Sequence, residues 1–366
     1  MNIDIILPFK EIFSHNKASA VSLTVKNSME YSKFNSVIKV YGQFIEDPFS
    51  EKHFTGIKIN KLLNFGKNVS VFKKYLILNS NNNKEKIIEF HNRPYVFNLA
   101  LKKINNKPIT LHFHNDPTLM KGSKSIKERV NIIKKAAAVY FVSNFIKNRF
   151  LEGINSEFDN LHVLPNGIQR RLNFMPNKKK EIIFIGRLVP EKGSHLFVQS
   201  IKKIVKEHPD WKFKIVGTAK AGQNKLVSNY ERTVVNEFKS LGDNTYYYGF
   251  IPNTEVQEIL RSASILVIPS LWDDPFPLTA LEGLSNGTAI IASNRGGLTE
   301  MLKDKGLLLD NINEKNLKNS IHNLILNADL LKQYQNKSWV KYKYNQTTIS
   351  IFQDKIRNQI FNSYYK

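Results

Sequence analysis

Two carboxylates, Asp274 and Glu282, stand in one stretch of the chain with seven residues between them. An apolar run at 265–268 precedes them and predicts a buried strand, a proline-broken loop carries Asp274, and a segment of helical character carries Glu282. Ligands of open α/β sheets bind just past the carboxyl ends of strands. Because a carboxylate accepts hydrogen bonds from two vicinal hydroxyls at once, this pair could hold the hydroxyls of a sugar and of a ribose.

Two cations, Arg187 and Lys192, follow a second predicted strand at 181–185. Gly186 and Gly193 flank them, and a helical pattern follows. A strand end, two glycines, two cations five residues apart and the N-terminus of a helix together form an anion site. The alternative is a solvent-exposed loop with two ordinary surface charges. The segment is not a Walker loop, because that motif's Gly-Lys-Ser/Thr ending is absent, and no GxGxxG run indicates a dinucleotide oxidoreductase.

Histidines occur in two further strand-like segments, 87–94 and 109–117. In the second segment His112 and His114 lie two residues apart, so on a strand both side chains would point to one face. His114 comes at the carboxyl end, where a side chain can reach a cleft between two domains, and we prefer it over His112 and His91 as a site residue. Isolated histidines are more often structural or surface groups, and this alternative stays open.

The composition is that of a globular protein, with 366 residues of which 42% are hydrophobic and 23% are charged. This length is sufficient for two domains. The net charge of +23, larger in the N-terminal half, suits a polyanion, an anionic membrane or phosphorylated substrates, and a Lys- and Asn-rich genome bias explains it equally well. The absence of cysteine excludes disulfides and thiolate metal sites. The first residues predict a strand rather than a signal peptide, and no apolar run is long enough to span a membrane.

A basic segment at 121–135 carries Ile126, Val130 and Ile133 at helical spacing, and it predicts an amphipathic surface helix. A solvated charged face is the simplest interpretation. Contact with anionic lipid or with a phosphorylated acceptor is the more specific one. Residues 46–83 show no clear pattern, and we expect them to be irregular.

Strands and helices alternate in both halves of the chain, which predicts an α/β protein with two doubly wound, Rossmann-like domains. A basic, proline-containing segment at 170–180 has little periodicity and predicts a linker between the domains. We therefore expect an N-terminal domain at 1–172, a second domain at 173–345 and a final helix at 346–366.

The stretch around Asp274 and Glu282 resembles the acidic signature of the retaining glycosyltransferases of family 4, in which two acids, usually both Glu, are separated by seven residues. Residues 186–193, GRLVPEKG, are similar to the family's loop of Gly-Arg-Leu followed by Lys-Gly. LHVLPNGIQ, at 161–169, resembles the family's PNG turn, although Gln169 stands where an acid usually closes that motif. The resemblance covers the whole chain as architecture, and its specific motifs lie mainly between 184 and 300.

The resemblance implies a GT-B fold, two domains facing across a cleft, with the last helix crossing back to the N-terminal domain. It implies that Arg187 and Lys192 hold the diphosphate of a nucleotide sugar, while Asp274 orients the donor sugar and Glu282 the ribose. His114 would face the transferred sugar, and with Asp274, Arg187 and Lys192 it would complete the catalytic set. The further donor-binding residues are Gly249, Phe250, Pro275, Phe276, Pro277 and Leu278.

Two departures from the family pattern, at Asp274 and Pro277, weaken the donor-sugar contact more than the nucleotide site, and a third lies in the first loop. Asp274 is one methylene shorter than the usual Glu. Pro277 removes an N–H where many members have Gly. Ala18-Ser19-Ala20 stands in the first loop where the family commonly has glycines, which are more permissive.

The resemblance therefore implies transfer of a sugar from a nucleotide-diphosphate sugar to the hydroxyl of a glycan or glycolipid acceptor, with retention, in surface glycan or lipopolysaccharide assembly. We expect no metal and no other cofactor, because fixed cations can serve and no convincing DxD element is present. We expect a cytoplasmic protein whose basic surface could contact anionic lipid at the inner face of the cell membrane. A nucleotide-sugar epimerase of the same fold is one alternative. A basic nucleic-acid-binding protein is the weaker one, because no RNP, zinc-finger or helix-turn-helix signature appears.

Overall fold

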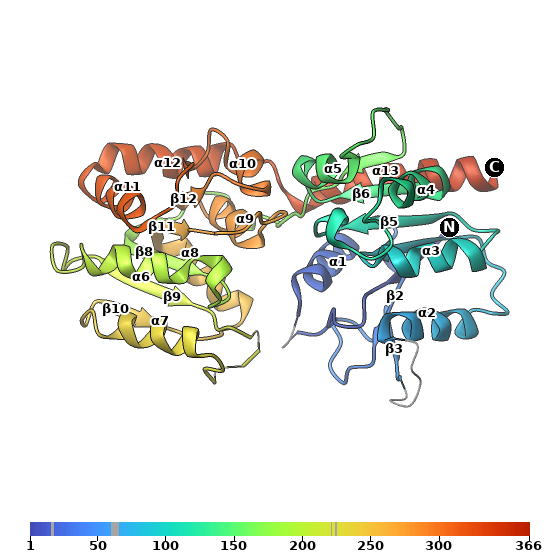
Figure 1. Cartoon of the computed structure of the whole chain (residues 1–366), viewed down its shortest axis with the longest axis horizontal. Coiled ribbons are helices and arrows are strands. Elements are labelled where there is room, and N and C mark those ends of the chain that lie inside the picture. Colours follow the sequence, from blue (N-terminus) through green and yellow to red (C-terminus); the bar gives the residue numbers. More distant parts are fainter. Residues whose placement is uncertain (16–17, 60–65, 221, 224) are drawn as a thin grey trace. The chain divides into compact units, whose positions relative to one another are not determined.

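The computed structural model describes residues 1–15, 18–59, 66–220, 222–223 and 225–366 (Figure 1). These residues form two compact units, each with its own sheet and core. The first unit comprises Met1–Gly167 and Tyr344–Lys366, and the second comprises Ile168–Lys343. The chain therefore passes between the units twice. The segment at 170–180, expected as a linker, belongs to the second unit.

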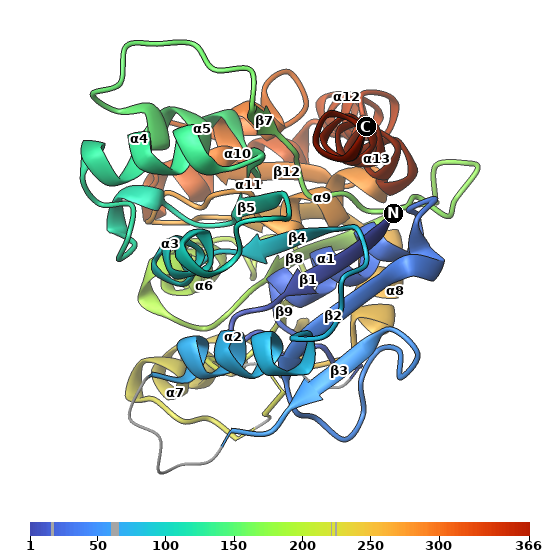
Figure 2. The same cartoon turned by 90° about the vertical axis from the view of Figure 1, so that its right-hand side faces the viewer.

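The first unit is built on a seven-stranded sheet of parallel neighbours in the order β3-β2-β1-β4-β5-β6-β7 (Figure 2). The strands are mostly apolar, as expected where helices cover both faces of a parallel sheet, although β4 and β5 also bury Glu89, His91 and His112. The chain leaves β1 towards β2 on one side and leaves β4 towards β5 on the other. Such a switch point opens a ligand crevice at the carboxyl ends of the two strands. The strands are β1 (Asn2–Ile6), β2 (Ile38–Gln43), β3 (Phe54–Ile57), β4 (Lys86–His91), β5 (Ile109–Phe113), β6 (Ala138–Phe141) and β7 (Leu161–Val163).

Helices cover both faces of this sheet. Right-handed crossovers place α1 on one face and α2 to α5 on the other, because the chain steps in opposite directions after β1 and after β3. The final helix, α13, packs against α1 and β4, and α2 packs against α3 (Figure 2). Ser143 caps α5 by accepting a hydrogen bond from the Ile146 N–H at 3.1 Å. The helices are α1 (Ala20–Glu30), α2 (Lys67–Leu78), α3 (Pro94–Lys103), α4 (Ile126–Lys135), α5 (Asn144–Leu151) and α13 (Gln346–Tyr365), with short 3₁₀ turns at Asn35–Val37 and Pro117–Leu119.

The expectation that residues 46–83 are irregular is wrong for the described parts, because these contain β3 and α2, while residues 60–65 lie outside the described residues. β3 is a short edge strand with a central glycine, Gly56, so it carries little of the alternation that marks a strand. α2 begins after Gly66 without a side-chain cap, and it exposes Ile77 by 65% and Leu78 by 59%. Its apolar residues therefore do not form one clean stripe, and the helical period is hidden in the sequence.

The amphipathic helix expected at 121–135 is shorter, and the face that it buries differs from the expected one. α4 starts at Ile126 after a capping box, in which Ser125 and Glu128 each bond the other's backbone N–H. Ile126, expected on the buried stripe, is 49% exposed. Arg129 is buried in its place, because its guanidinium donates to the Lys124 carbonyl at 2.8 Å and to the Glu152 carbonyl at 2.5 Å. A buried arginine that bonds backbone carbonyls through its terminal nitrogens cannot be recognised from helical spacing.

The second unit is built on a six-stranded parallel sheet in the order β10-β9-β8-β11-β12-β13. One part of its core, which includes Phe184, Phe197 and Phe213, lies between the sheet and helices α6, α7 and α11. The strands are β8 (Lys179–Ile185), β9 (Lys212–Val216), β10 (Thr245–Tyr247), β11 (Ala263–Ile268), β12 (Ala289–Ser293) and β13 (Leu307–Leu309). The helices are α6 (Ser194–Lys202), α7 (Asn229–Lys239), α8 (Asn253–Ser262), α9 (Leu278–Ser285), α10 (Gly297–Leu302), α11 (Glu314–Leu326) and α12 (Ala328–Val340), with a 3₁₀ turn at Pro190–Lys192. The predicted α/β class with two doubly wound parallel sheets is thus confirmed.

A buried ionic network joins α13 to the rest of the first unit. The Arg357 guanidinium donates to both carboxylate oxygens of Glu89, at 2.8 and 2.7 Å, and to Asp354 at 3.0 Å. Asp354 in turn accepts from the Ser32 hydroxyl at 2.8 Å. Arg357 and Glu89 are at most 1% exposed. These contacts connect the last helix to β4 and to the residues that follow α1.

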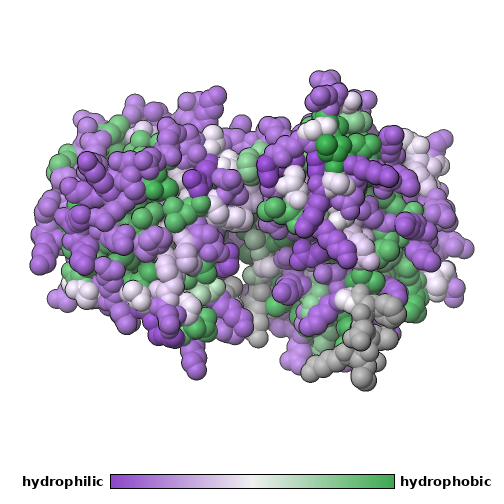
Figure 3. Space-filling model, in the orientation of Figure 1, coloured by the Kyte–Doolittle hydropathy of each residue, from purple (hydrophilic) through white to green (hydrophobic). Residues whose placement is uncertain are grey.

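The surface is predominantly polar. Hydrophilic side chains cover most of the face shown in Figure 3, and apolar areas are interspersed among them. Across the residues that the structure describes, no helix combines the length and the apolar character needed to cross a bilayer.

Candidate functional site

The predicted site residues of the second unit lie on loops that leave the carboxyl ends of its strands. Arg187 and Lys192 follow β8, Gly249 and Phe250 follow β10, and Asp274 follows β11. In a parallel sheet these ends lie at one edge, which is where ligands of open α/β folds bind. Residues from three separate parts of the sequence are therefore brought to the same edge.

Backbone hydrogen bonds hold these loops against one another. The Gly217 N–H donates to the Gly249 carbonyl at 2.7 Å and joins the loops after β9 and β10. The Leu271 N–H donates to the Glu191 carbonyl at 2.8 Å and joins the loops after β11 and β8. Bonds of this kind fix the positions of loops that the chain alone does not connect.

Lys192 and Asp274 form an ion pair between the loops after β8 and β11. Asp274 is only 6% exposed, and the Lys192 ammonium also lies over the Trp272 ring, 5.2 Å from its centroid. A buried carboxylate is costly unless a cation or hydrogen-bond donors satisfy it, and Lys192 meets that requirement. The cation predicted to hold phosphate and the acid predicted to orient a sugar therefore contact each other directly.

Two glycines allow these loops to approach closely. Gly193 has φ +70°, and a Cβ there would lie 1.9 Å from the Pro269 carbonyl oxygen. A Cβ on Gly297 would lie 2.0 Å from the Pro275 carbonyl oxygen, and the Gly297 N–H donates to the Asp274 carbonyl at 2.7 Å. Any larger residue at either position would push apart the loops that carry Lys192 and Asp274.

Arg187 lies on the same loop as Lys192 but is much more accessible. Its side chain is 52% exposed, and its guanidinium lies 3.6 Å from a Glu191 carboxylate oxygen. Exposed ion pairs of this kind contribute little to stability, so the contact does not hold the guanidinium firmly in one place.

Glu282 is buried inside α9 and faces the start of α8. Its carboxylate oxygen Oε1 accepts from the Asn253 amide at 2.6 Å, and Gln257 also bonds it. Burial raises the pKa of Glu282 to about 7, although the hydrogen bonds from Asn253 and Gln257 partly oppose this rise. Asn253 comes soon after Gly249 and Phe250, so Glu282 lies next to the loop that follows β10.

The raised pKa of Glu282 makes stability depend on pH. The native state holds this proton more tightly than the unfolded chain does, so the stabilisation is complete below about pH 4.5 and is lost as the pH rises through about 7.

We expect Glu282→Gln, which keeps an oxygen for Asn253, to match the wild type at pH 5 and to be more stable at pH 8. The expected gain in free energy of unfolding is about 2–3 kcal/mol. Urea unfolding at the two pH values measures it. Glu258→Gln, at a carboxylate 67% exposed on α8, is the control and should show no such difference. Equal stability of wild type and Glu282→Gln at pH 8 would contradict the assignment.

The remaining residues predicted to bind the donor also lie in this region. Pro275, Phe276 and Pro277 are buried between β11 and α9, and Leu278 begins the helix and is partly buried. Gly249 is buried with φ +66°. Their contacts with a donor stay predictions.

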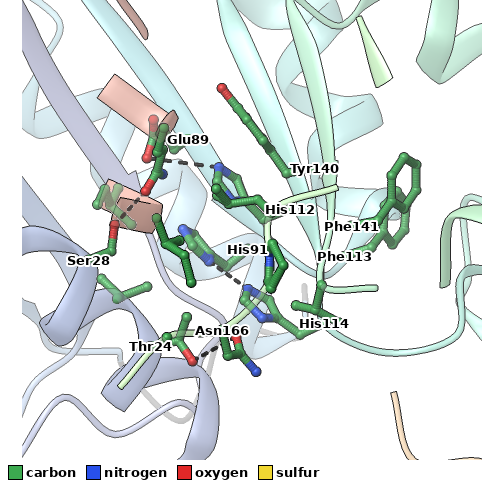
Figure 4. A pocket seen from close by; sticks show the side chains of 18 of the residues that line it. Thr24, Ser28, Glu89, His91, His112, Phe113, His114, Tyr140, Phe141 and Asn166 are labelled. Atoms are coloured by element: carbon green, nitrogen blue, oxygen red, sulfur yellow. Dashed lines mark hydrogen bonds and ion pairs between the residues drawn. The ribbon is translucent and has the colours of Figure 1, made fainter. Parts of the chain in front are cut away.

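Three histidines stack side by side at the carboxyl ends of β4 and β5 in the first unit (Figure 4). The ring centroid of His91 lies 4.3 Å from that of His112 and 5.1 Å from that of His114. His91 Nδ1 and His114 Nε2 are 2.8 Å apart, which is a hydrogen bond. On the other side, His112 stacks on Tyr140 with centroids 4.3 Å apart. His114, the preferred candidate from the sequence, is the partly exposed end of this row.

Burial keeps the pKa of all three histidines well below the usual range, and repulsion between neighbouring rings lowers it further. The rings are therefore neutral at neutral pH, so one nitrogen of the His91–His114 pair donates and the other accepts. His91 Nε2 has no hydrogen-bond partner within the described residues. A buried N–H without a partner is rarer than an unused lone pair, which favours His91 Nδ1–H as the donor to His114. His114 then keeps its Nδ1–H available as a donor.

Two clusters among the described residues offer three ligand atoms to a metal ion. The first is Glu89, His91 and His112, and the second is Glu207, His208 and His322. In the first, both oxygens of Glu89 already accept from Arg357 at 2.8 and 2.7 Å, so a metal ion would have to displace a buried guanidinium. These residues therefore fit a metal ion poorly.

Sequence reasoning missed several residues that support the site. Asn253 and Gln257 hold the Glu282 carboxylate. Glu231, fully buried at the start of α7, accepts from the Ala219 N–H at 2.6 Å and from the Val227 N–H at 2.8 Å, and so shapes the loop after β9. The Ser-x-x-Glu spacing of residues 228–231 signals a helix start, but it does not show that the Glu bonds a loop.

Comparison with known proteins matches residues 167–341 to the family model of glycosyl transferases group 1. The chain is 28% identical over 208 residues to the putative glycosyltransferase YtcC of Bacillus subtilis, covering 50% of each chain. It is 30% identical over 193 residues to the uncharacterized glycosyltransferase MJ1178 of Methanocaldococcus jannaschii, covering 52% of this chain and 50% of that protein. The chain thus spans about half the length of the curated relatives it matches.

Among solved structures, Anabaena Alr3699/HepE in complex with UDP superposes with a TM-score of 0.75 at 15% identity, covering 98% of this chain and 100% of that one. The same Anabaena protein is also solved with UDP-glucose, with a TM-score of 0.69 at 15% identity, covering 99% of each chain. At such identity the likeness shows the fold alone, which is the GT-B fold of two Rossmann-like domains. Residues 167–341 thus match the glycosyl transferases group 1 model, and the chain has the GT-B fold.

Proposed function

We propose that this protein is a retaining glycosyltransferase that moves a sugar from a nucleotide-diphosphate sugar to an acceptor hydroxyl. The observation that carries the proposal is the ion pair between Lys192 and Asp274, which puts an anion-binding cation beside a hydroxyl-binding acid at the ligand edge of the second sheet. The matched family model covers this region, and the Anabaena protein of the same fold is solved with UDP and UDP-glucose.

In this proposal Arg187 and Lys192 bind the diphosphate. The bond between the anomeric carbon and the distal phosphate oxygen breaks, the acceptor oxygen bonds to the same face of that carbon, and the acceptor's hydroxyl proton leaves with the nucleoside diphosphate. Charge grows on the distal phosphate as the sugar becomes oxocarbenium-like. The two cations oppose that charge, Lys192 from its partly buried place beside Asp274 and Arg187 once the phosphate holds its guanidinium, and this electrostatic stabilisation is the main source of the rate. The same cations make a metal unnecessary, so activity should survive EDTA.

Asp274 and Glu282 bind hydroxyl groups of the donor. When phosphate takes over Lys192, the Asp274 carboxylate turns from the ammonium to the hydroxyls of the sugar. Glu282, with a pKa raised to about 7, accepts from the ribose hydroxyls in its ionised form, and these bonds replace the solvation that burial removed. His114 donates from its free Nδ1–H to the transferred sugar.

The acceptor is proposed to be a glycan or glycolipid in surface glycan or lipopolysaccharide assembly, modified on the cytoplasmic side of the cell membrane. The net charge of +23 favours contact with anionic lipid headgroups. The basic residues of α4, whose exposed apolar residue is Ile126, are one such surface.

The proposal is tested by incubating the protein with a panel of nucleotide sugars, with and without a membrane glycolipid extract, and following the products by mass spectrometry. We expect consumption of one donor only when acceptor is present, release of the nucleoside diphosphate, and an unchanged anomeric configuration. Formation of an isomeric donor without acceptor would identify an epimerase instead. Arg187→Ala should lose most of the transfer rate, whereas Arg232→Ala, at an arginine on α7, should retain it.

A further inference from the structure

A pocket that does not include the three stacked histidines lies at the carboxyl ends of the strands of the first unit. It has a volume of about 530 Å³, within the range of roughly 300–1,000 Å³ that small-molecule sites occupy. Its walls come from the start of α2, the start of α3 and the loop that follows β5. It is lined by Gly66, Lys67, Asn68, Val69, Arg93, Pro94, Tyr95, Val96, Leu119, Met120 and Lys121.

Three cations from three different elements line this pocket: Lys67 on α2, Arg93 before α3 and Lys121 after β5. None of the described lining residues is Asp or Glu. Across the described ranges, none of the three cations has a carboxylate partner within salt-bridge distance, and Lys67 and Lys121 lie over the rings of Phe9 and Tyr95 instead. Like charges gathered in a concave surface repel one another, and an anion in the pocket would remove that repulsion.

The pocket lies beside the switch point of the sheet, where β1 and β4 send the chain in opposite directions. Burial raises the pKa of Glu11, in the loop after β1, and the hydrogen bond from Ser19 and the charge of Arg93, which follows β4, partly oppose this rise. The Phe9 N–H, also after β1, donates to the Asn68 side chain at 2.7 Å and ties α2 to this edge. Ligands of open α/β sheets bind at this place.

The wall that carries Lys121 is held rigidly against α3. The Tyr95 N–H donates to the Lys121 carbonyl at 3.0 Å, and the Asn98 amide donates to the Gly122 carbonyl at 2.9 Å. Gly122 has φ +96°, and a Cβ there would lie 2.5 Å from the Tyr95 nitrogen. The position of Lys121 is therefore set before any ligand arrives, which lowers the entropic cost of binding.

The rim of the pocket is apolar where the cations end. Leu119 is 74% exposed and Tyr95 is 40% exposed. Exposed apolar side chains beside cations suit the organic part of a ligand whose anionic group the cations hold, since an inorganic ion alone would leave them in water.

We propose that Lys67, Arg93 and Lys121 form a binding site for the phosphate ester of the acceptor, a phosphorylated sugar or lipid whose organic part lies against Tyr95 and Leu119. The identity of this ligand as the acceptor rests on the proposed function, whereas the phosphate site itself rests on the pocket. Phosphate monoesters and diesters share the chemistry that three cations recognise. A soluble phosphorylated sugar and a lipid headgroup are its two sources, and experiment separates them.

The test uses the full-length protein and a matched pair of triple variants. The first is Lys67→Gln, Arg93→Gln and Lys121→Gln. The control removes the same charge from exposed lysines outside the pocket and outside α4, with Lys52→Gln, Lys84→Gln and Lys103→Gln. Calorimetric titration with sn-glycerol 1-phosphate, and with uncharged glycerol, measures binding of a soluble phosphate ester. Sedimentation with phosphatidylcholine vesicles, with and without phosphatidylglycerol, measures binding of a lipid phosphate.

We expect the pocket variant to bind at least about tenfold more weakly than the wild type, because each lost bond to a charged group has about that effect on affinity. The control should bind like the wild type, and glycerol should not bind. If the wild type binds sn-glycerol 1-phosphate, a soluble phosphate ester is sufficient to occupy the site. If it binds only vesicles that contain phosphatidylglycerol, the ligand is a lipid phosphate. Equal affinities of the two triple variants for both probes would overturn the proposal.

Titration with UDP and GDP distinguishes failure of this inference from failure of the proposed function. A nucleoside diphosphate should bind the pocket variant as well as it binds the wild type, because Lys192 and Arg187 lie in the other unit. Loss of phosphate-ester binding with intact nucleoside diphosphate binding supports the pocket. If the protein binds the phosphate ester but binds neither UDP nor GDP, the phosphate site in the pocket is supported and the proposed donor site is rejected.

Discussion

Lys192→Met is expected to lower kcat for sugar transfer by about 10²–10³-fold, with a smaller change in KM for the donor. In the proposed mechanism the Lys192 ammonium binds the distal phosphate, where negative charge grows as the sugar leaves. Removal of one group that stabilises such charge typically lowers kcat by about 10²–10³-fold. Methionine keeps much of the length of the side chain and removes only its charge. Steady-state transfer kinetics at saturating acceptor measure the change.

The control for this prediction is Lys202→Met, at a lysine 61% exposed on α6, which should transfer at the wild-type rate. Lys192→Met also leaves the buried Asp274 carboxylate without its cation, so urea unfolding must show that the variant is folded. The double variant Lys192→Met, Asp274→Asn should lose far less than the product of the two single losses, because the two groups act as a unit. A folded Lys192→Met enzyme with the wild-type kcat would remove Lys192 from the mechanism.

Arg357→Met is expected to lower the free energy of unfolding of the first unit by about 3–5 kcal/mol. Arg357 donates to Glu89 and Asp354, and all three groups are buried, so the substitution leaves two carboxylates without their cation. Urea unfolding followed by circular dichroism measures the loss. Hydrogen exchange of residues 346–365 should show that α13 detaches before the rest of the unit.

Two further variants distinguish this effect from a general loss of charge. Lys180→Met removes a cation from an exposed pair, with Lys180 62% and Asp210 54% exposed, and it should leave stability unchanged. Adding Glu89→Gln to Arg357→Met should restore part of the lost stability, because it removes one of the unpaired charges. If Arg357→Met and Lys180→Met were equally stable, the network would not be what holds α13 in place.

The chemistry-bearing loops were predictable because each has a local signal. A short apolar run followed by glycine or proline marks a strand that ends in a loop, and this pattern located Arg187, Lys192 and Asp274 beyond β8 and β11. Parallel sheets then require such loops to share one edge. The prediction that these residues belong to one site therefore followed from the order of elements together with a general property of α/β sheets.

The partners of the same residues were not predictable. Nothing near Glu282 in the chain indicates that Asn253 holds its carboxylate, and the pairing of Lys192 with Asp274 joins loops 82 residues apart. The same holds for His114, whose tautomer depends on His91 from a neighbouring strand. Whether a side chain is buried, and against which group, is decided by packing between distant segments, and a local pattern carries no information on it.

Periodicity also failed where the buried residue was polar or the helix had no cap. Arg129 occupies an inward position of α4 that spacing gives to an apolar residue, because three backbone carbonyls accept hydrogen bonds from its two terminal nitrogens. The helix α2 has no side-chain cap and exposes Ile77 and Leu78, so the sequence shows no clear helical period there. In both cases the tertiary environment outweighed the local preference.

From the sequence alone came the class of fold, the two alternating halves and the residue types able to hold phosphate and hydroxyl groups. These depend on hydrophobic period, turn residues and charge, which are properties of short segments. Only the tertiary structure decided that Lys192 bonds Asp274, that Glu282 is buried with a raised pKa, and that cations from three separate elements share one pocket. Those facts depend on distances between remote residues and on the removal of water, which arise only when the segments pack together.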